Sequence, residues 1–330
     1  MFEPHQKDDV IKERYKVQSV IGQGGMGRVY LARDLRLEGR LCAIKSVHYD
    51  QSLPGEAVKQ TREQFEREAT VLARLDHPNL PKVSDFFSGA ERDYLVMDYV
   101  PGKDLRELMI EAKRQGKFLK ERDVLNWANQ IAEALKYLHG QDPIILHRDI
   151  KPSNIKLTPG GIIKLVDFGL VKILISGEKT ITVVQGHGSA YYTPLEQYGG
   201  DTGHTDPRSD VYSLGATLYH LLTNEPPLEA RERFLDPTGR LTILEKNKSI
   251  SPRTARVVEM ALKVHPDQRL QSIQEFQQAL LGEWDPKRNP EAPLPAPNLR
   301  DLLEPTGENL LAWGAALVFF LSLIVTLLQG

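Results

Sequence analysis

Alternating polar and apolar residues predict strands near the beginning of the chain. Residues 15–21 (YKVQSVI) and 28–33 (RVYLAR) both alternate β-forming apolar side chains with polar ones. The stretch 22–27 (GQGGMG) lies between them. Glycine leaves backbone amides uncovered and permits close approach to a ligand, so this stretch is a candidate phosphate cradle at the tip of a β-hairpin. On this segment alone, an ordinary glycine-rich turn remains the alternative.

Two other kinds of glycine-rich phosphate site fit this segment poorly. A dinucleotide-binding fold requires a helix directly after the glycines, whereas residues 28–33 alternate as a strand. A P-loop requires Gly-Lys followed by Ser or Thr, and that run does not follow the glycines. The pattern therefore favours a hairpin over both.

Most of the remaining periodicity before residue 283 is helical. An early helix is predicted within 61–80, where Glu68 lies on the same stripe as the apolar residues, so its carboxylate needs a partner. A strand within 93–102 stops at Pro-Gly. Two long helices then follow, in 124–140 and 209–223, with Gly140 and Asn224 as expected stops.

The end of the chain has a different composition. Residues 309–328 carry no charged side chain and are almost wholly apolar, and the run 310–328 would span about 28 Å as a helix. We expect this segment to be a transmembrane helix rather than a buried core helix. The segment 284–308 includes "NPEAPLPAP", which is typical of an extended linker.

Composition and charge narrow the class of protein. The chain is 41% hydrophobic and 26% charged, with a formal net charge of −2, so we expect no nucleic-acid partner. Cys42 is the single cysteine, which excludes an intramolecular disulfide and fits a reducing compartment. It lies in an apolar run, which predicts a buried core residue rather than a reactive thiol.

A series of short motifs lies between residues 15 and 282. In chain order they are the Gly-rich hairpin, Ala43-Ile-Lys45, Glu68, His147-Arg-Asp149, Asn154, Asp167-Phe-Gly169, Pro194-Leu-Glu196, Asp210 and Arg269. In order and spacing this series resembles the protein-kinase family, specifically the bacterial eukaryotic-like serine/threonine kinases. The resemblance implies an α+β, two-lobed protein-kinase fold, with a small β-rich N-lobe and a larger helical C-lobe.

The resemblance implies catalytic and metal-binding roles. Lys45 would hold the α- and β-phosphates of ATP, and Glu68 would pair with that lysine. Mg2+ prefers hard oxygen donors, which suits Asn154 and Asp167 as its protein ligands. Asp149 would accept the proton of the attacking hydroxyl. Lys151 would neutralise charge on the transferring group, in the serine/threonine pattern.

The resemblance also implies a set of nucleotide-binding residues. Backbone amides of the hairpin would cover the phosphates, apolar side chains would enclose the adenine, and the segment after Met97 would read its edge. Lys156 departs from this pattern, because the family usually places an apolar floor for adenine there. The implied nucleotide-binding residues are Ile21, Gly22, Gly24, Gly25, Gly27, Val29, Ala43, Lys45, Met97, Asp98 and Val100.

Further residues match structural or substrate-binding positions of the family. Glu196 and Arg269 match a buried ion pair, and Asp210 matches a cap on the backbone of the catalytic loop. In "GSAYYTPLE", Ser189 stands in for a substrate-loop threonine and Tyr191 for a glycine. These departures affect substrate preference rather than the chemistry.

Regulation by phosphorylation is a further implication of the resemblance. Arg148 would pair with a phosphate on the loop between residues 170 and 189, where Thr180 and Thr182 occupy the middle and Ser176 lies nearby. The alternative is that these are ordinary polar loop residues. Membrane tethering favours encounters between two copies, so we expect a homodimer that phosphorylates itself in trans.

We therefore expect a membrane-anchored serine/threonine protein kinase with a cytoplasmic kinase domain. It would transfer the γ-phosphoryl group of Mg-ATP to protein hydroxyls. The alternatives are a nucleotide-binding pseudokinase or scaffold, and a small-molecule phosphotransferase of similar fold. The expected organisation is an extension at 1–14, an N-lobe at 15–100, a C-lobe at 101–283, a linker at 284–308 and a single-pass transmembrane helix at 309–328.

Overall fold

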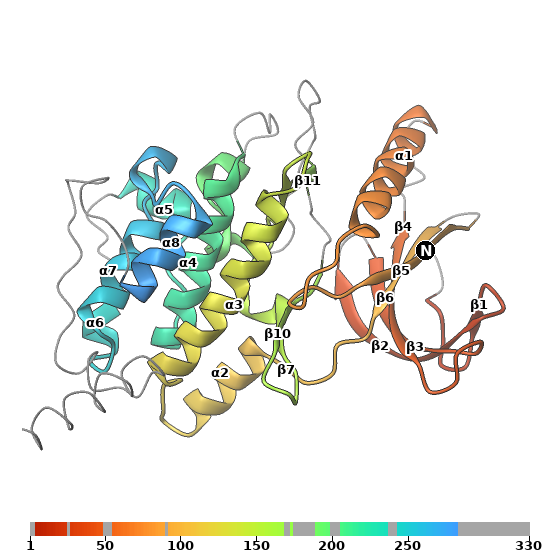
Figure 1. Cartoon of the computed structure of the whole chain (residues 1–330), viewed down its shortest axis with the longest axis horizontal. Helices are drawn as coiled ribbons and strands as arrows, with labels where there is room; N and C mark the ends of the chain where they lie inside the picture. Colours follow the sequence, from red (N-terminus) through yellow and green to blue (C-terminus); the bar gives the residue numbers. More distant parts are fainter. Residues whose placement is uncertain are drawn as a thin grey trace, which may run out of the picture.

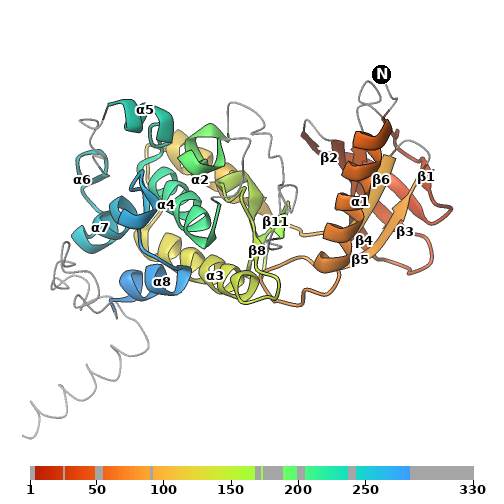
Figure 2. The same cartoon turned by 90° about the horizontal axis from the view of Figure 1, so that it is seen from above.

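The chain folds into two lobes that lie side by side (Figures 1 and 2). The first hundred residues form the N-lobe, which is mostly β-structure with one helix. The C-lobe contains the other helices, as the sequence predicted. The chain passes from the N-lobe to the C-lobe at residues 99–102. The computed structural model describes residues 4–24, 27–48, 55–89, 92–167, 172–173, 189–198, 205–236 and 243–282.

The N-lobe is built on a six-stranded antiparallel sheet in the order β1-β2-β3-β4-β6-β5. Helix α1 (Gly55–Leu72) lies against it. Sequential strands are mostly neighbours, which is the arrangement expected for a chain of short antiparallel connections. The strands are β1 Val10–Ile11, β2 Tyr15–Gly24, β3 Gly27–Asp34, β4 Leu41–His48, β5 Val83–Ser88 and β6 Arg92–Asp98.

The central strands of this sheet are buried on both faces. Side chains alternate along a strand, so Ala43 joins the large core shared with the C-lobe, whereas Cys42 and Ile44 join a separate core on the outer face. In β6, Met97 and Val96 divide in the same way. The inner face of β4 therefore presents Ala43 and Lys45 toward the junction of the lobes.

The N-terminal segment packs on the N-lobe. Strand β1 pairs with the start of β2, and His5 Nε2 lies 2.8 Å from the hydroxyl oxygen of Tyr94. The His5 ring also meets Tyr30 edge-on, with centroids 5.5 Å apart. Residues 10 and 11 of the expected extension thus form part of the N-lobe sheet.

The C-lobe is organised around α4, most of whose side chains are buried. It packs against α2, α3, α7 and α8, so it contacts nearly every other layer of this lobe. The helices are α2 Leu105–Arg114, α3 Glu121–His139, α4 Pro207–Thr223, α5 Ala230–Leu235, α6 Ile243–Lys246, α7 Pro252–Ala261 and α8 Ile273–Leu281.

Two small sheets lie at the side of the C-lobe that faces the N-lobe (Figure 1). The first has the order β10-β9-β7 and the second pairs β11 with β8, all antiparallel. Their strands have only two or three residues, which is too short for a periodic pattern in the sequence. They are β7 Lys103–Asp104, β8 Ile145–Leu146, β9 Ile155–Leu157, β10 Ile163–Leu165 and β11 Lys172–Ile173.

The predicted helix ends were correct for α3 and α4. Gly140 follows α3 as its C-cap, and Asn224 ends α4 in the left-handed conformation with φ 58°. Helix α1 ends at Leu72, earlier than the predicted segment. Turns replace the helix there, and Pro78 restricts the residue before it to extended conformations.

The expected linker at 284–308 and the transmembrane helix at 309–328 lie outside the residues that the structure describes. Within the described ranges up to residue 282, no helix combines the length and apolar character needed to cross a membrane. The predicted span therefore stays a prediction.

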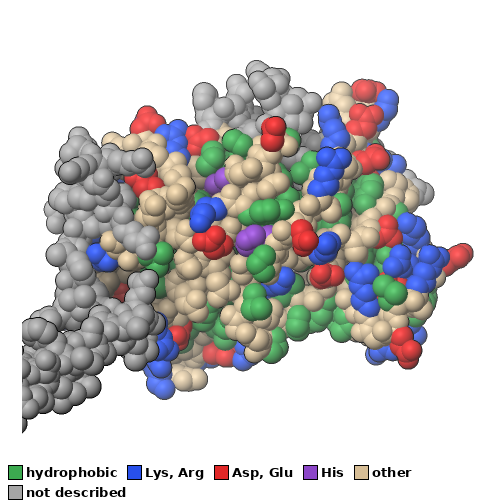
Figure 3. All heavy atoms as spheres, viewed as in Figure 1, with side chains coloured by type: hydrophobic (Ala, Val, Ile, Leu, Met, Phe, Trp, Pro, Cys, Tyr) green, Lys and Arg blue, Asp and Glu red, His purple; other side chains and the backbone are tan. Residues whose placement is uncertain are grey.

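Charges of both signs are spread over the surface. On the face drawn in Figure 3, acidic and basic side chains lie interspersed over both lobes. This mixture accords with the small formal net charge of −2 for the whole chain.

A fully buried arginine, Arg269, connects several segments of the C-lobe. Arg269 forms a two-pronged ion pair with Glu196, at 2.6 Å and 3.0 Å. Its other donors reach the backbone carbonyls of Lys263, Arg208 and Val264 at 2.7–3.1 Å. All five guanidinium donors are thus satisfied, as a buried charge requires. The predicted pairing of Glu196 with Arg269 is confirmed.

We expect Arg269→Met to lower the free energy of unfolding by about 3–5 kcal/mol, because it leaves the Glu196 carboxylate buried without its cation. Chemical denaturation of the purified protein measures this. The control is Arg122→Met, since the Arg122 side chain is 62% exposed beside Asp123, and exposed pairs contribute about 0–1 kcal/mol. Equal losses in the two variants would contradict the assignment.

Candidate active site

The glycine-rich segment forms the predicted hairpin. Strands β2 and β3 pair up to Gly24 and Gly27, and Gly22 pairs with Val29. A side chain at Gly27 would place its Cβ 1.8 Å from the carbonyl oxygen of Ser46 on β4, so the sheet itself requires glycine there. Gly25 lies outside the described residues.

The predicted adenine-enclosing side chains lie together on three neighbouring strands. Val29 pairs with Lys45 across β3 and β4, and Ala43 pairs with Met97 across β4 and β6. Ala43 and Met97 are buried, and Val29 packs against the same core. Ile21 lies before the glycines and is 46% exposed.

The connection between the lobes begins at Asp98. Its backbone N–H donates to the carbonyl of Lys82 at 2.9 Å, which anchors the end of β6. The Asp98 carboxylate faces outward and pairs with Arg40 at 3.4 Å. Val100, two residues on, is buried. This geometry brings the predicted adenine-edge residues beside Met97.

An ion pair joins the two lobes. The Nζ of Lys45 on β4 lies 2.8 Å from Oδ1 of Asp167, which follows β10 in the C-lobe. The Lys45 ammonium lowers the pKa of the Asp167 carboxyl, although burial opposes this shift. Asp167 has φ 66°, an uncommon conformation for a residue other than glycine. The predicted partnership of Lys45 with Glu68 stays a prediction.

The predicted catalytic lysine Lys151 and the predicted metal ligand Asn154 converge on the Asp149 carboxylate. Lys151 Nζ donates to both of its oxygens, at 2.9 Å and 2.8 Å, and Asn154 Nδ2 donates to Oδ2 at 2.8 Å. The same Lys151 ammonium reaches Ser189 Oγ at 2.9 Å. Ser189 of the substrate loop is therefore held beside the Lys151–Asp149 pair.

The two predicted metal ligands are positioned by one backbone hydrogen bond. Val166 precedes Asp167 and donates its N–H to the carbonyl of Asn154 at 2.8 Å. The Asn154 amide nitrogen donates to Asp149, and its oxygen is an acceptor that has only a long contact of 3.5 Å with Ser153 Oγ. An amide oxygen and a carboxylate are the hard donors that Mg2+ prefers, so Asn154 and Asp167 fit a site for this ion.

The catalytic-loop backbone is held by Asp210, as predicted. Its carboxylate is fully buried and accepts the N–H groups of His147 and Arg148, at 3.0 Å and 2.9 Å. His139 Nε2 adds a third hydrogen bond at 2.8 Å. Burial raises the pKa of Asp210, but the hydrogen bonds and the electrostatic influence of His139 and His147 outweigh it, and the net shift is downward.

Sequence reasoning missed His139. It is the last residue of α3 and contacts a carboxylate 71 positions away in the chain. A histidine near the end of an amphipathic helix is common, because it interacts favourably with the helix dipole. Only its pairing with Asp210 marks it as a positioning residue.

Arg148 is almost completely buried beside the catalytic loop, with φ 66°. Burial lowers the pKa of its guanidinium to about 10, while Asp210 and Glu68 act in the opposite direction. The Glu68 carboxylate therefore interacts electrostatically with Arg148. The loop residues Ser176, Thr180 and Thr182 lie outside the described part of the chain.

The substrate-loop segment 189–198 is anchored to α4. Ser213 Oγ donates to the Tyr192 carbonyl at 2.9 Å, and the Tyr192 hydroxyl meets His220 Nδ1 at 2.6 Å. Burial, helped by Lys113 and Arg106, lowers the pKa of His220 to about 4, so the ring is neutral near pH 7. Tyr191 is half-buried against the core.

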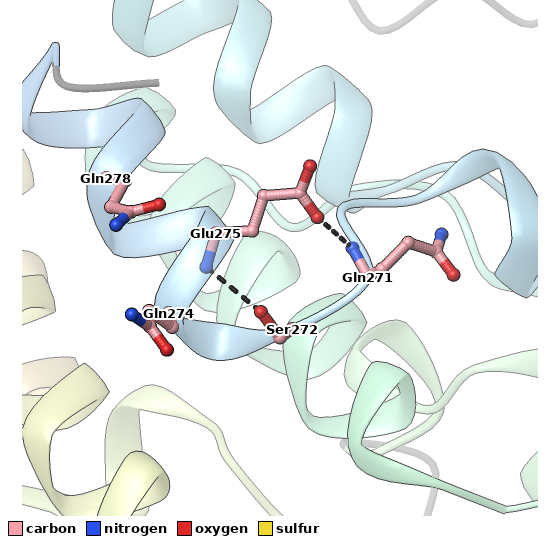
Figure 4. Close-up of a pocket in the computed structure, with 5 residues that line it drawn as sticks. All are labelled: Gln271, Ser272, Gln274, Glu275 and Gln278. Atoms are coloured by element: carbon pink, nitrogen blue, oxygen red, sulfur yellow. Dashed lines mark hydrogen bonds between the residues drawn. The ribbon is translucent and has the colours of Figure 1, made fainter. Parts of the chain in front are cut away.

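A separate hollow at the start of α8 takes no part in this arrangement. Its polar groups complete the helix end: Ser272 Oγ accepts the N–H of Glu275 at 3.1 Å, and the Glu275 carboxylate accepts the N–H of Gln271 at 2.6 Å (Figure 4). We assign it no chemistry. Its lining residues are Gln271, Ser272, Gln274, Glu275 and Gln278.

Comparison with known proteins agrees with this geometry. Residues 15–284 match the family model of the protein kinase domain. The chain is 36% identical over 277 residues to a probable serine/threonine-protein kinase SCO3848 of Streptomyces coelicolor, covering 80% of this chain and 39% of that protein. It is 39% identical over 220 residues to the serine/threonine-protein kinase PrkC of Bacillus subtilis, covering 66% and 32%.

A solved structure shows the same fold. The PknI kinase domain of Mycobacterium tuberculosis superimposes with a TM-score of 0.64 at 28% identity, covering 85% of this chain and all of that one. The chain spans 39% of the length of the curated Streptomyces relative, so similarity concerns the shared domain. From the domain match, the shared fold and the converging motif residues, we conclude that the chain belongs to the protein kinase family.

Proposed function

We propose that the protein is a serine/threonine kinase that transfers the γ-phosphoryl group of Mg-ATP to protein hydroxyls. The arrangement of Lys151 carries this proposal, because its ammonium contacts both the Asp149 carboxylate and the Ser189 hydroxyl. A carboxylate that can act as a base and a hydroxyl of the substrate loop are thus bridged by one cation. The relatives named as serine/threonine kinases support the same reaction class.

The side chains divide the work of the reaction. Asp149 orients the incoming hydroxyl and accepts its proton, and Lys151 lies beside it to offset negative charge on the transferring group. Lys45 supplies a fixed cation for the phosphates on the N-lobe side. Bound Mg2+ would neutralise phosphate charge between Asn154 and Asp167.

Replacing Asp149 or Asp167 by asparagine should lower the rate of phosphoryl transfer by about a hundred-fold or more, because each change removes charge from the reacting centre. The assay follows γ-labelled ATP into a mixture of serine and threonine peptides. Asp76→Asn, whose side chain is 80% exposed, is the matched control. Near wild-type transfer by Asp167→Asn would refute the site, and absence of transfer by the wild type would favour a pseudokinase.

Phosphorylation of the loop between residues 170 and 189 is the proposed means of regulation. Arg148 is a buried cation and directly precedes Asp149 in the chain. A loop phosphate that paired with Arg148 would therefore order the loop next to Asp149. The proposed route is phosphorylation in trans between two copies held at one membrane.

Changing Thr180 and Thr182 together to alanine should lower peptide phosphorylation on the order of tenfold after incubation with Mg-ATP, since no loop phosphate can then form there. Phosphatase treatment should reduce the wild type to the level of the double variant. A double variant as active as the phosphorylated wild type would show that these threonines are ordinary loop residues.

We further propose that residues 309–328 anchor the chain in a membrane, with the kinase domain in the cytoplasm where ATP is found. The full-length protein should therefore stay in the membrane fraction through a high-salt wash and leave it only in detergent, because an apolar helix is not released by screening charge. A variant ending at residue 308 is the control and should be soluble and active. Release of the full-length protein by salt alone would contradict integral insertion.

A further inference from the structure

Lys156 occupies the middle of the small sheet between the two predicted halves of the nucleotide site. Strand β9 follows Asn154 directly, and β7 follows the connection between the lobes. In the register of this sheet, Lys156 pairs with Asp104 of β7 on one side and with Lys164 of β10 on the other. Lys156 therefore lies between the metal-binding residue and the adenine-edge segment.

The side chain of Lys156 points away from the apolar core of the C-lobe. Its neighbours Ile155 and Leu157 both contact that core, and side chains alternate along a strand. Lys156 thus faces the opposite side of the small sheet, which lies at the junction of the lobes in Figure 1. Its side chain is half-buried there.

The charge of Lys156 remains available for a ligand. Among the described residues, its ammonium forms no hydrogen bond and no ion pair. Asp104 is close enough for its electrostatic influence, although burial is the larger effect and raises the pKa of that carboxyl. Asp104 Oδ1 accepts the N–H of Glu107 at 2.8 Å as the cap of α2, which fixes its carboxylate in place.

A carboxylate beside an ammonium suits vicinal hydroxyl groups. A hydroxyl both donates and accepts, so one sugar hydroxyl can donate to Asp104 while accepting from Lys156. A half-buried ammonium that donates no hydrogen bond to the protein gains a partner when a ligand hydroxyl accepts from it. The methylene stem of the lysine can meanwhile lie against the apolar face of a purine.

We infer that Lys156 is a specificity-determining residue that donates a hydrogen bond to a ribose hydroxyl of the bound nucleotide. The inference rests on the proposed function, because it takes the substrate to be a ribonucleoside triphosphate. If the inference is correct, the Lys156 side chain makes the site bind a nucleotide with ribose hydroxyls more tightly than one without them. An apolar residue at this position would not discriminate between the two.

The experiment compares binding of Mg-ATP and Mg-2′,3′-dideoxy-ATP by calorimetry. Lys156→Met should weaken ATP binding about tenfold, as expected for loss of a hydrogen bond from a charged donor, and should leave binding of the dideoxy nucleotide unchanged. Lys103→Met is the matched control, since Lys103 lies on the adjacent strand, is exposed and pairs with Glu111. It should bind both nucleotides as the wild type does.

A second variant guards against a folding defect. Lys156→Arg keeps the charge and the donors, so it should retain the preference for ATP over the dideoxy nucleotide. Equal binding of ATP by Lys156→Met and wild type, or an equal loss for both nucleotides, would overturn the inference, as would failure of the wild type to bind ATP. Wild type that binds as predicted but transfers no phosphoryl group would overturn only the proposed function.

Discussion

The buried carboxylate of Asp210 is the constraint on which the active site depends. A charge with no solvent access is tolerated only if hydrogen bonds replace its hydration. Asp210 meets this requirement by accepting from the backbone of His147 and Arg148 and from His139. Because α4 is itself buried in the C-lobe, these bonds fix the catalytic loop to a helix that packs on several sides. Asp149 follows Arg148 directly in the chain, so the same hydrogen bonds hold its backbone in place.

A series of hydrogen bonds connects the catalytic loop to the other groups of the site. Asn154 bonds to Asp149, and the N–H of Val166 bonds to Asn154. Asp167 then meets Lys45, which brings the N-lobe sheet to the same centre. This last link joins the two lobes through a partly buried ion pair, whereas the earlier links lie within the C-lobe. Relative motion of the lobes would therefore act first on Lys45 and least on Asp149.

The sequence was informative where residue type determines the structure locally. Alternation predicted the hairpin strands, Gly140 and Asn224 marked helix ends, and the motif order predicted the residues that converge on Asp149. Long-range pairing was less accessible. The contact of His139 with Asp210 and the short strands β7 to β11 leave no periodic signal, because they form only when distant segments pack. Arg269 was predicted as one half of an ion pair, but its three backbone acceptors required the structure.

Burial separates the residues that hold the catalytic loop in place from those that we propose select the ligand. Arg269 and Asp210 are enclosed with every partner in place, so substitution there leaves an uncompensated charge and destabilises the whole lobe. Lys156 and Tyr191 depart from the family pattern, and both side chains are only half-buried. A change at such a position alters what the site contacts without disturbing the catalytic loop. The same scaffold can therefore keep its phosphoryl-transfer geometry while its nucleotide floor and substrate loop diverge.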